Sequence, residues 1–245
     1  MDTIDKVDPR TLRELSILNA AYLYFLADAG SEELTSIAQW TFDRGIRIVT
    51  DKSGEMKTRL KSENDGAGIG KILTDGSLVI EYYTSLQKQA LTSIERIVSK
   101  DNKSGARKHL SNYIKKMDEF GNLMAKHFCD TVEEKAKEKS IEIIPCIKKE
   151  GTWESKAKKI IPKRKEIGTL MLDGIPVEEW KEVKENPRWW EPANWASASY
   201  WWCDGKRNLK EIKELLELEA GVPVENFDLI VYYTFLEKYG LVEFV

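Results

Sequence analysis

The chain has 245 residues, of which 42% are hydrophobic and 32% charged, a length that allows one large domain or two smaller ones. Its formal net charge of −3 gives no overall electrostatic attraction to nucleic acid. No stretch approaches the roughly 20 apolar residues of a transmembrane helix, and the acidic, polar first ten residues do not fit a signal peptide. We therefore expect a cytoplasmic protein.

Cysteine and histidine usage argues against disulfides and against a zinc site. The three cysteines are far apart and form no CxxC pair, which is typical of free thiols in a reducing compartment. The two histidines are His109 and His127. Cys129 and Asp130 follow His127, but on a helix these three positions do not converge as a hydrolytic zinc site requires. We expect no metal ligands and no cofactor in this chain, and both histidines at the surface or the core edge.

Two helices are predicted at the start of the chain. The first covers residues 9 to 29, with Asp8 as its N-cap and Gly30 as the residue that ends it. Ser31 is predicted to cap the second helix, which extends to about residue 60. Apolar residues recur at helical spacing in the first helix, at Leu12, Leu15, Leu18, Tyr22, Phe25 and Leu26.

Residues 61 to 71 are predicted to be a break between helices. Gly66, Gly68 and Gly70 give this stretch some likeness to a phosphate-binding loop. Such a loop needs a preceding strand and a fixed spacing to its Lys and Ser/Thr residues, and neither is present. We therefore interpret the stretch as a linker.

Two long amphipathic helices follow, over about residues 74 to 99 and 105 to 139. A short polar turn joins them, so they are predicted to form an antiparallel hairpin. Their apolar stripes could bury themselves in a bundle with the first two helices, or pair with a second copy across a two-fold axis. Met117, Phe120 and Met124 of the second stripe are therefore candidate interface residues.

The next stretch is basic. A short β-like run over residues 141 to 147 is followed, in residues 148 to 165, by eight basic and two acidic side chains, a local charge of +6. This could be a patch for nucleic acid or an acidic partner. It could equally be a solvated linker, which we favour because Trp153 is the only aromatic residue available to stack on bases.

Tryptophan is concentrated in the last third of the chain, where residues 180 to 202 hold six of the eight tryptophans. Such a cluster indicates either the core of a small domain or a docking surface. We favour the core for most of them and regard Trp189 and Trp190, after Pro187, as the best candidate anchors. The docking candidates are Trp189, Trp190, Trp195, Trp201 and Trp202.

Three small helices and a strand are predicted at the end of the chain, over residues 193 to 203, 208 to 221, 223 to 239 and 241 to 245, as in a winged-helix-like fold. The inward residues of the third helix are predicted to be Phe227, Ile230, Val231, Phe235 and Leu236. That helix carries three acidic residues and one lysine, so it would repel a phosphate backbone, whereas a DNA-recognition helix carries basic or amide side chains. A protein contact is the better interpretation.

The predicted fold class is mainly α, a long-helix bundle or hairpin followed by a small winged-helix-like α(+β) domain. Residues 1 to 140 are expected to form the helical bundle with its long antiparallel hairpin. Residues 141 to 185 are expected to be a basic linker with short β-like segments. Residues 186 to 245 are expected to form the Trp-rich winged-helix-like domain.

Two separated stretches resemble one family. Asp2, Thr3, Asp5 and Val7 match the D-T-x-D-x-V-type segment that, in metallopeptidase family 28, follows the last metal-binding histidine and leads into a long helix. Residues 189 to 221 and 235 to 244 resemble the C-terminal winged-helix-like appendage of a microbial branch of these di-zinc aminopeptidases. The DGKRNL-x-EI run from Asp204 to Ile212 is the most specific part of this likeness. The resemblance implies that the first helices are the tail of a catalytic domain.

The resemblance implies chemistry that the chain does not itself carry. The family needs two zinc ions bridged by a carboxylate and a glutamate as general base. These groups are expected upstream of Met1, so the chain is predicted to be inactive alone, with zinc in the missing catalytic domain.

The expected function is that of a non-catalytic C-terminal accessory region of a zinc-dependent aminopeptidase, serving oligomerisation, docking or active-site access. Its expected partner is the catalytic aminopeptidase domain or a second copy of itself, and no membrane. The alternatives are a winged-helix nucleic-acid-binding regulator and a free-standing dimeric helical scaffold.

Overall fold

The structure, a computed structural model, is mainly helical with one small two-stranded sheet, as the sequence predicts. The chain divides into two compact units, Met1–Cys146 and Ile147–Val245, and we call them the helical unit and the second unit. Each holds its own hydrophobic core. The structure describes residues 8–97, 103–146, 151–166, 168, 170, 175–180, 195–221, 223–224 and 227–245.

The first two helices form where the sequence places them. Helix α1 spans Pro9–Asp28, and the Asp8 carboxylate caps it by accepting a hydrogen bond from Arg10 N at 2.9 Å. Helix α2 spans Ser31–Ser62. Its N-cap is Gly30 rather than the predicted Ser31, and Glu33 Oε2 accepts from the Gly30 N–H at 2.9 Å.

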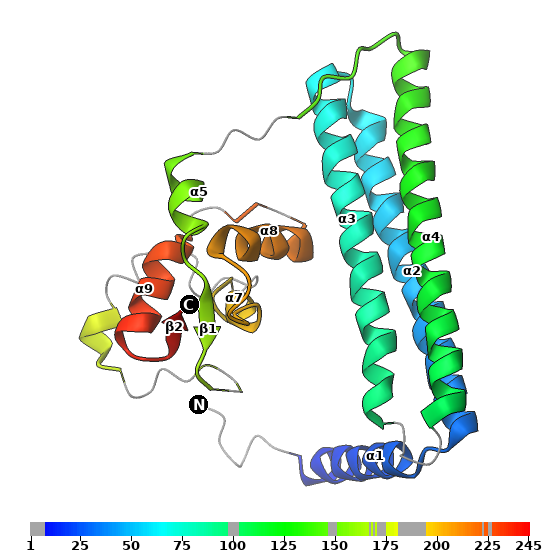
Figure 1. The fold of residues 1–245 in the computed structure, drawn as a ribbon, viewed down its shortest axis with the longest axis vertical. Helices are drawn as coiled ribbons and strands as arrows, with labels where there is room; N and C mark the ends of the chain where they lie inside the picture. Colours follow the sequence, from blue (N-terminus) through cyan, green and yellow to red (C-terminus); the bar gives the residue numbers. More distant parts are fainter. Residues whose placement is uncertain are drawn as a thin grey trace. The chain divides into compact units, whose positions relative to one another are not determined.

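Three long helices lie side by side as a bundle (Figure 1). Besides α2, these are α3 (Gly66–Ser93), which continues into the short 3-10 helix η2 (Ile94–Ile97), and α4 (Lys103–Glu138). The antiparallel α3–α4 hairpin is the one predicted from the sequence. Its apolar stripes lie mostly inside this bundle. Met117, Phe128 and Val132 of α4 are fully inaccessible, whereas Leu78, in the predicted stripe of α3, is 42% exposed.

The predicted linker over residues 61 to 71 is wrong, because α3 begins at Gly66 and the break is confined to residues 63 to 65. Asp65 caps α3 by accepting from Gly68 N at 3.1 Å. The glycines serve close packing: a Cβ atom on Gly66 would lie 2.1 Å from the Glu142 carbonyl oxygen, and one on Gly70 would lie 1.8 Å from that of Ile144. From the sequence these glycines were interpreted as part of a linker, because the residues that they contact, Glu142 and Ile144, lie about 75 positions later in the chain.

Residues 141–146 form an extended segment that returns along α3, and we call it the strap. Helix α4 ends in a reversal at Ser140, whose φ of 55° is left-handed. Ile141 N donates to Ala136 O at 2.9 Å and Ser140 N to Lys137 O at 3.1 Å, the pair of bonds that closes many helix ends. The β-like run predicted here is thus extended, but it has no strand partner among the described residues.

The second unit is built from short elements, and its sheet corrects the predicted domain plan. Strands β1 and β2 pair antiparallel, with Lys163 opposite Glu243. Because β1 lies in the stretch predicted to be a linker, residues 151–166 belong to the second unit. A three-residue strand has too few side chains to show a period of two, so periodicity could not reveal it. The elements are α5 (Thr152–Ala157), β1 (Pro162–Arg164), η4 (Val177–Trp180), α7 (Trp195–Trp201), α8 (Leu209–Ala220), α9 (Leu229–Lys238) and β2 (Val242–Phe244).

Helix caps in the second unit follow local sequence. Asn208 caps α8, and Gly221 ends it in the left-handed conformation with φ 67°. Helix α9 is shorter than predicted because Asp228 is its N-cap, accepting from Ile230 N at 2.8 Å. The side chain of Val231, predicted to face inward, is 43% exposed, whereas Tyr232 and Tyr233 are buried. Whether these helices and the two-stranded sheet are related to winged-helix proteins stays a prediction.

Candidate interaction surfaces

Helix α1 carries a large exposed apolar surface, which we call the α1 apolar face. It buries none of its residues, so the stripe of α1 is not covered within the bundle that was one of the two arrangements considered from the sequence. The exposed fractions of its large apolar side chains range from 39% to 71%. The α1 apolar face consists of Leu12, Leu15, Ile17, Leu18, Tyr22, Leu23, Tyr24 and Phe25.

Helix α1 combines a large exposed apolar surface with no net charge. Monomeric proteins rarely expose contiguous apolar patches larger than a few hundred Å², and each aromatic residue alone can bury about 150–250 Å². The helix has two arginines, one glutamate and one aspartate, so its charges cancel. It therefore lacks the basic polar face of helices that lie on membranes. Across the described residues, every helix is too short or too polar to cross a bilayer.

The sequence of α1 already contains a sign of this exposure, in apolar residues on more than one side of the helix. Ile17, Leu23 and Tyr24 fall outside the stripe that the periodicity singled out, so apolar residues extend around most of the helix. A helix that is apolar on more than one face is buried on more than one side in its working state. Within α1 only Leu26 is partly buried, and the buried Ala29 is the C-cap that follows the helix.

The candidate interface residues of the long hairpin lie on the inside of the bundle. Met117 is fully buried, so it cannot be part of a docking surface in this structure. Phe120 and Met124 are partly buried and pack against the clusters around Leu91 and Phe128. These residues were predicted to be at an interface because the apolar stripe of α4 could pair with a second copy. In the structure the same stripe packs against α2 and α3 of its own chain.

The tryptophan candidates divide between core and surface. Trp195 is 2% exposed and belongs to the core of the second unit, so it is not a docking residue. Trp202 is partly buried, with its Nε1 donating to Glu219 Oε2 at 3.3 Å. Trp201 is 54% exposed and is a surface candidate. Trp189 and Trp190 lie outside the described residues.

The basic stretch is partly used in packing. Lys163 Nζ lies 2.7 Å from Glu243 Oε1 across the sheet, and the Arg164 guanidinium lies 5.2 Å from the centre of the Trp201 ring. Trp153 Nε1 donates to Asp228 Oδ1 at 3.0 Å, and the Lys213 ammonium lies 4.8 Å from the centre of that indole ring. The one aromatic residue of the stretch is therefore engaged within the unit, which weakens the case for stacking on nucleic-acid bases.

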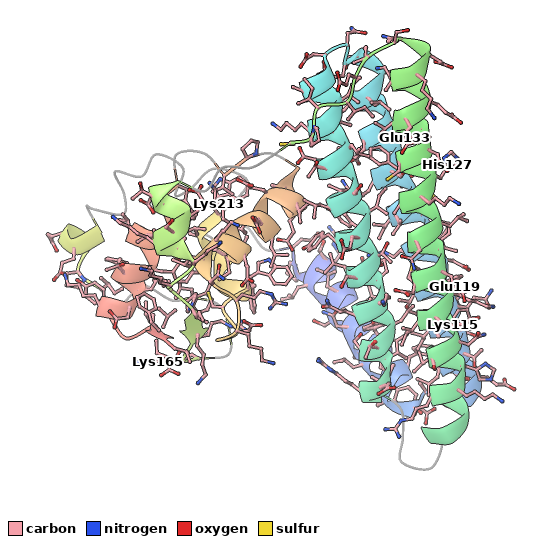
Figure 2. The ribbon with its side chains drawn as sticks, turned by 45° about the horizontal axis from the view of Figure 1, so that its top comes forward. Lys115, Glu119, His127, Glu133, Lys165 and Lys213 are labelled. Carbon is pink, nitrogen blue, oxygen red and sulfur yellow. The ribbon has the colours of Figure 1, made fainter. Side chains whose placement is uncertain are left out.

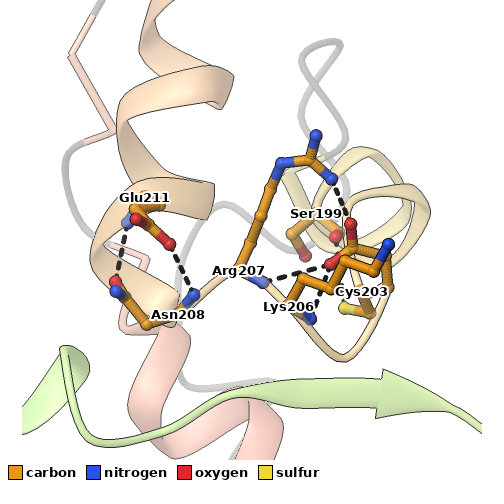
Figure 3. A network of polar contacts seen from close by, with 7 residues as sticks. Ser199, Cys203, Lys206, Arg207, Asn208 and Glu211 are labelled. Carbon is orange, nitrogen blue, oxygen red and sulfur yellow. Dashed lines mark hydrogen bonds and ion pairs between the residues drawn. The ribbon is translucent and has the colours of Figure 1, made fainter.

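The run that is most specific in the family resemblance forms a turn and a helix cap (Figure 3). Asp204 accepts from the backbone N–H groups of Lys206 and Arg207 at 2.9 and 3.1 Å, and pairs with the Arg207 guanidinium. Burial opposes ionisation of Asp204, but these bonds and the arginine charge together lower its pKa. Asn208 and Glu211 then cap α8 reciprocally, at 2.9 and 3.0 Å. These hydrogen bonds stabilise the turn after Asp204 and the first turn of α8.

A buried polar chain connects α7 to α9. Cys203 Sγ lies 2.8 Å from Tyr233 Oη, and Tyr233 donates to Ser199 Oγ at 3.0 Å. Ser199 in turn donates to the Ala196 carbonyl at 2.9 Å. Burial raises the pKa of the Cys203 thiol to about 12, although the bond to Tyr233 acts in the opposite direction. A thiol in this state is not a nucleophile at neutral pH.

We expect Cys203 to resist a thiol reagent in the native protein and to react once the second unit is unfolded. Mass spectrometry after timed labelling, with and without denaturant, measures this directly. A matched variant, Tyr233→Phe, removes the hydroxyl that contacts the sulfur but keeps the buried ring, so labelling should stay slow. Rapid native modification of Cys203 would show that the core around it opens readily.

The two histidines lie apart from each other on the surface of α4. Both His109 and His127 are exposed, as expected, and His127 Nδ1 lies 3.3 Å from Thr131 Oγ1 on the outer side of α4 (Figure 2). Within the described residues, no three His, Cys, Asp or Glu side chains are grouped so that they could hold a metal ion. No family profile, no curated protein and no solved structure matches this chain.

Proposed function

We propose that this chain is an accessory region of a zinc-dependent aminopeptidase of metallopeptidase family 28, and that α1 packs against the catalytic domain. The observation that carries the proposal is the α1 apolar face, whose eight large apolar side chains are all exposed. Covering them removes apolar surface from water at roughly 25 cal/mol per Å². The helix therefore gains most of its stability when a partner covers it.

The position of α1 supports this choice of partner. The segment with Asp2, Thr3, Asp5 and Val7, which resembles the end of the family's catalytic domain, directly precedes α1 in the sequence. The absence of net charge on α1 favours an apolar protein surface. The bundle and the second unit each hold a separate core, so both can be attached to a catalytic domain as preformed units that shape access to its active site.

The alternatives draw less support. A dimer through the long hairpin would need the stripes of α3 and α4, but these are packed against α2. In the nucleic-acid alternative, α9 would face a phosphate backbone with Asp228 at its start and Glu237 near its end. A second copy docking through α1 is an outcome that the experiment below separates.

The test is co-expression of the tagged chain with a family 28 catalytic domain that ends after its D-T-x-D-x-V-type segment. We expect the two to co-purify, with zinc and aminopeptidase activity in the captured fraction. Leu18→Glu, in the middle of the α1 apolar face, should abolish capture. Leu123→Glu is the matched control, because Leu123 on α4 is 62% exposed and Leu18 64%, and it should leave capture intact.

Three outcomes would contradict the proposal. Tight stoichiometric zinc and activity on an amino-acid amide in the purified chain alone would make it an enzyme. Light scattering that shows a dimer lost in Leu18→Glu, without capture of the catalytic domain, would make α1 a self-association helix. If the chain binds labelled double-stranded DNA in a gel-shift assay at low salt, and this binding weakens steeply as the salt concentration rises, the nucleic-acid-binding regulator is favoured.

A further inference from the structure

We propose that the strap is a displaceable latch, which docks on α3 and thereby fixes the point at which the chain leaves the helical unit. In the docked state, residues 141–146 lie along the first turns of α3; in the released state, they detach while the bundle stays folded. This inference concerns the helical unit alone and does not depend on the proposed function.

The fit between strap and helix is carried by two glycines one helical turn apart. Cβ atoms on Gly66 and Gly70 would stand 2.1 Å and 1.8 Å from the carbonyl oxygens of Glu142 and Ile144. Real Cβ atoms do not approach backbone oxygen so closely. Glycine also lowers helix stability relative to alanine, so its use at both positions indicates that the strap needs this space.

The docked strap is held by few contacts. Ile144 N donates to Gly66 O at 3.1 Å. Ile141 and Ile143 are partly buried against the cluster around Phe128, while Glu142, Ile144 and Pro145 between and after them are exposed. An extended segment with alternate residues exposed and no strand partner in the described part of the chain has the features of a low-stability element.

Ser140 is the pivot of the latch. Its left-handed φ of 55° redirects the chain from α4 onto α3. Residues other than glycine adopt this conformation only at a cost in free energy. A serine therefore makes the reversal less stable than the glycine usually found there, and release of the strap frees it from the strain.

Release changes the reach of the chain. Six extended residues span about 20 Å at roughly 3.3 Å per residue. The second unit begins in sequence directly after the strap, at Ile147. Docking therefore fixes where the chain leaves α3, and release lets the end of the strap, at Cys146, range about 20 Å from Ser140.

The thiol of Cys146, partly buried at the end of the strap, reports on docking. The full chain carrying Cys129→Ser is labelled with a thiol reagent at neutral pH. Gly70→Ala should raise the labelling rate of Cys146 about fivefold or more, because overpacking of this contact displaces the strap. Gly54→Ala is the matched control: this glycine is also within a long helix, but its added Cβ would meet nothing within 4 Å. It should leave the rate unchanged.

Two further variants keep the test decisive if Gly70→Ala perturbs α3. Ile143→Ala removes a strap anchor without touching the helix and should also accelerate labelling, while Ser140→Gly relieves the pivot and should slow it. Hydrogen exchange of the Ile144 amide should follow the same order. The proposal is wrong if Gly70→Ala and Ile143→Ala leave both readouts unchanged with the bundle folded by circular dichroism, or if release occurs only with global unfolding.

Discussion

Replacing Phe128 with alanine should lower the free energy of unfolding of the helical unit by about 3–5 kcal/mol. The Phe128 ring is fully inaccessible and lies in the cluster shared by α2, α3 and α4. It packs directly over Gly76, where an added Cβ would be 2.3 Å from the ring. Gly76 on the facing helix has no side chain with which to fill the cavity. Urea denaturation followed by far-ultraviolet circular dichroism measures the loss.

The matched control for this substitution is Leu123→Ala on the same helix. Leu123 is 62% exposed, so its removal should change stability by no more than about 0.5 kcal/mol. Phe120→Ala should fall between the two, because Phe120 is only partly buried at the contact between the clusters. Equal losses for Phe128 and Leu123 would show that α4 presents a different face to the bundle.

The second large effect is expected from Leu236→Ala in α9, at about 2–5 kcal/mol. Leu236 is fully buried in the core of the second unit. Because the two units have separate cores, the loss should be confined to the second unit. Tryptophan fluorescence follows it selectively, since Trp40 is the only tryptophan before residue 147.

Val231→Ala is the control for that variant. Val231 lies on the same helix but is 43% exposed, so its truncation should be nearly neutral. The circular-dichroism transition of the bundle should keep its midpoint in both variants. A common shift of both transitions in Leu236→Ala would mean that the units unfold as one cooperative body.

The start of α1 and both ends of α8 were predictable because their determinants are local. Asp8 and Asn208 lie at the starts of α1 and α8 and accept bonds from backbone N–H groups two or three residues away. Gly221 ends α8 with a conformation that other residues adopt at a cost. The long hairpin was predictable for a similar reason, because an apolar stripe with helical period over many residues is hard to mistake.

Contacts between distant residues were not predictable. Gly66 and Gly70 have the composition of a loop, and only the strap lying against them explains why they begin a helix. Strand β1 exists because β2, about 80 residues later, offers its backbone. The apolar stripe of α1 can be recognised in the sequence. Whether the rest of the chain covers that stripe depends on where each helix is placed in the fold.

The absence of histidine clusters and the apolar character of α1 can both be read from the residues alone, because they depend on composition and on period. Only the tertiary structure separates Met117 and Trp195, which are buried, from Trp201 and the α1 apolar face, which are exposed. Apolar residues have the same hydrophobicity in a core and at an interface. What distinguishes them is whether another part of the same chain reaches them, and that is a property of the fold.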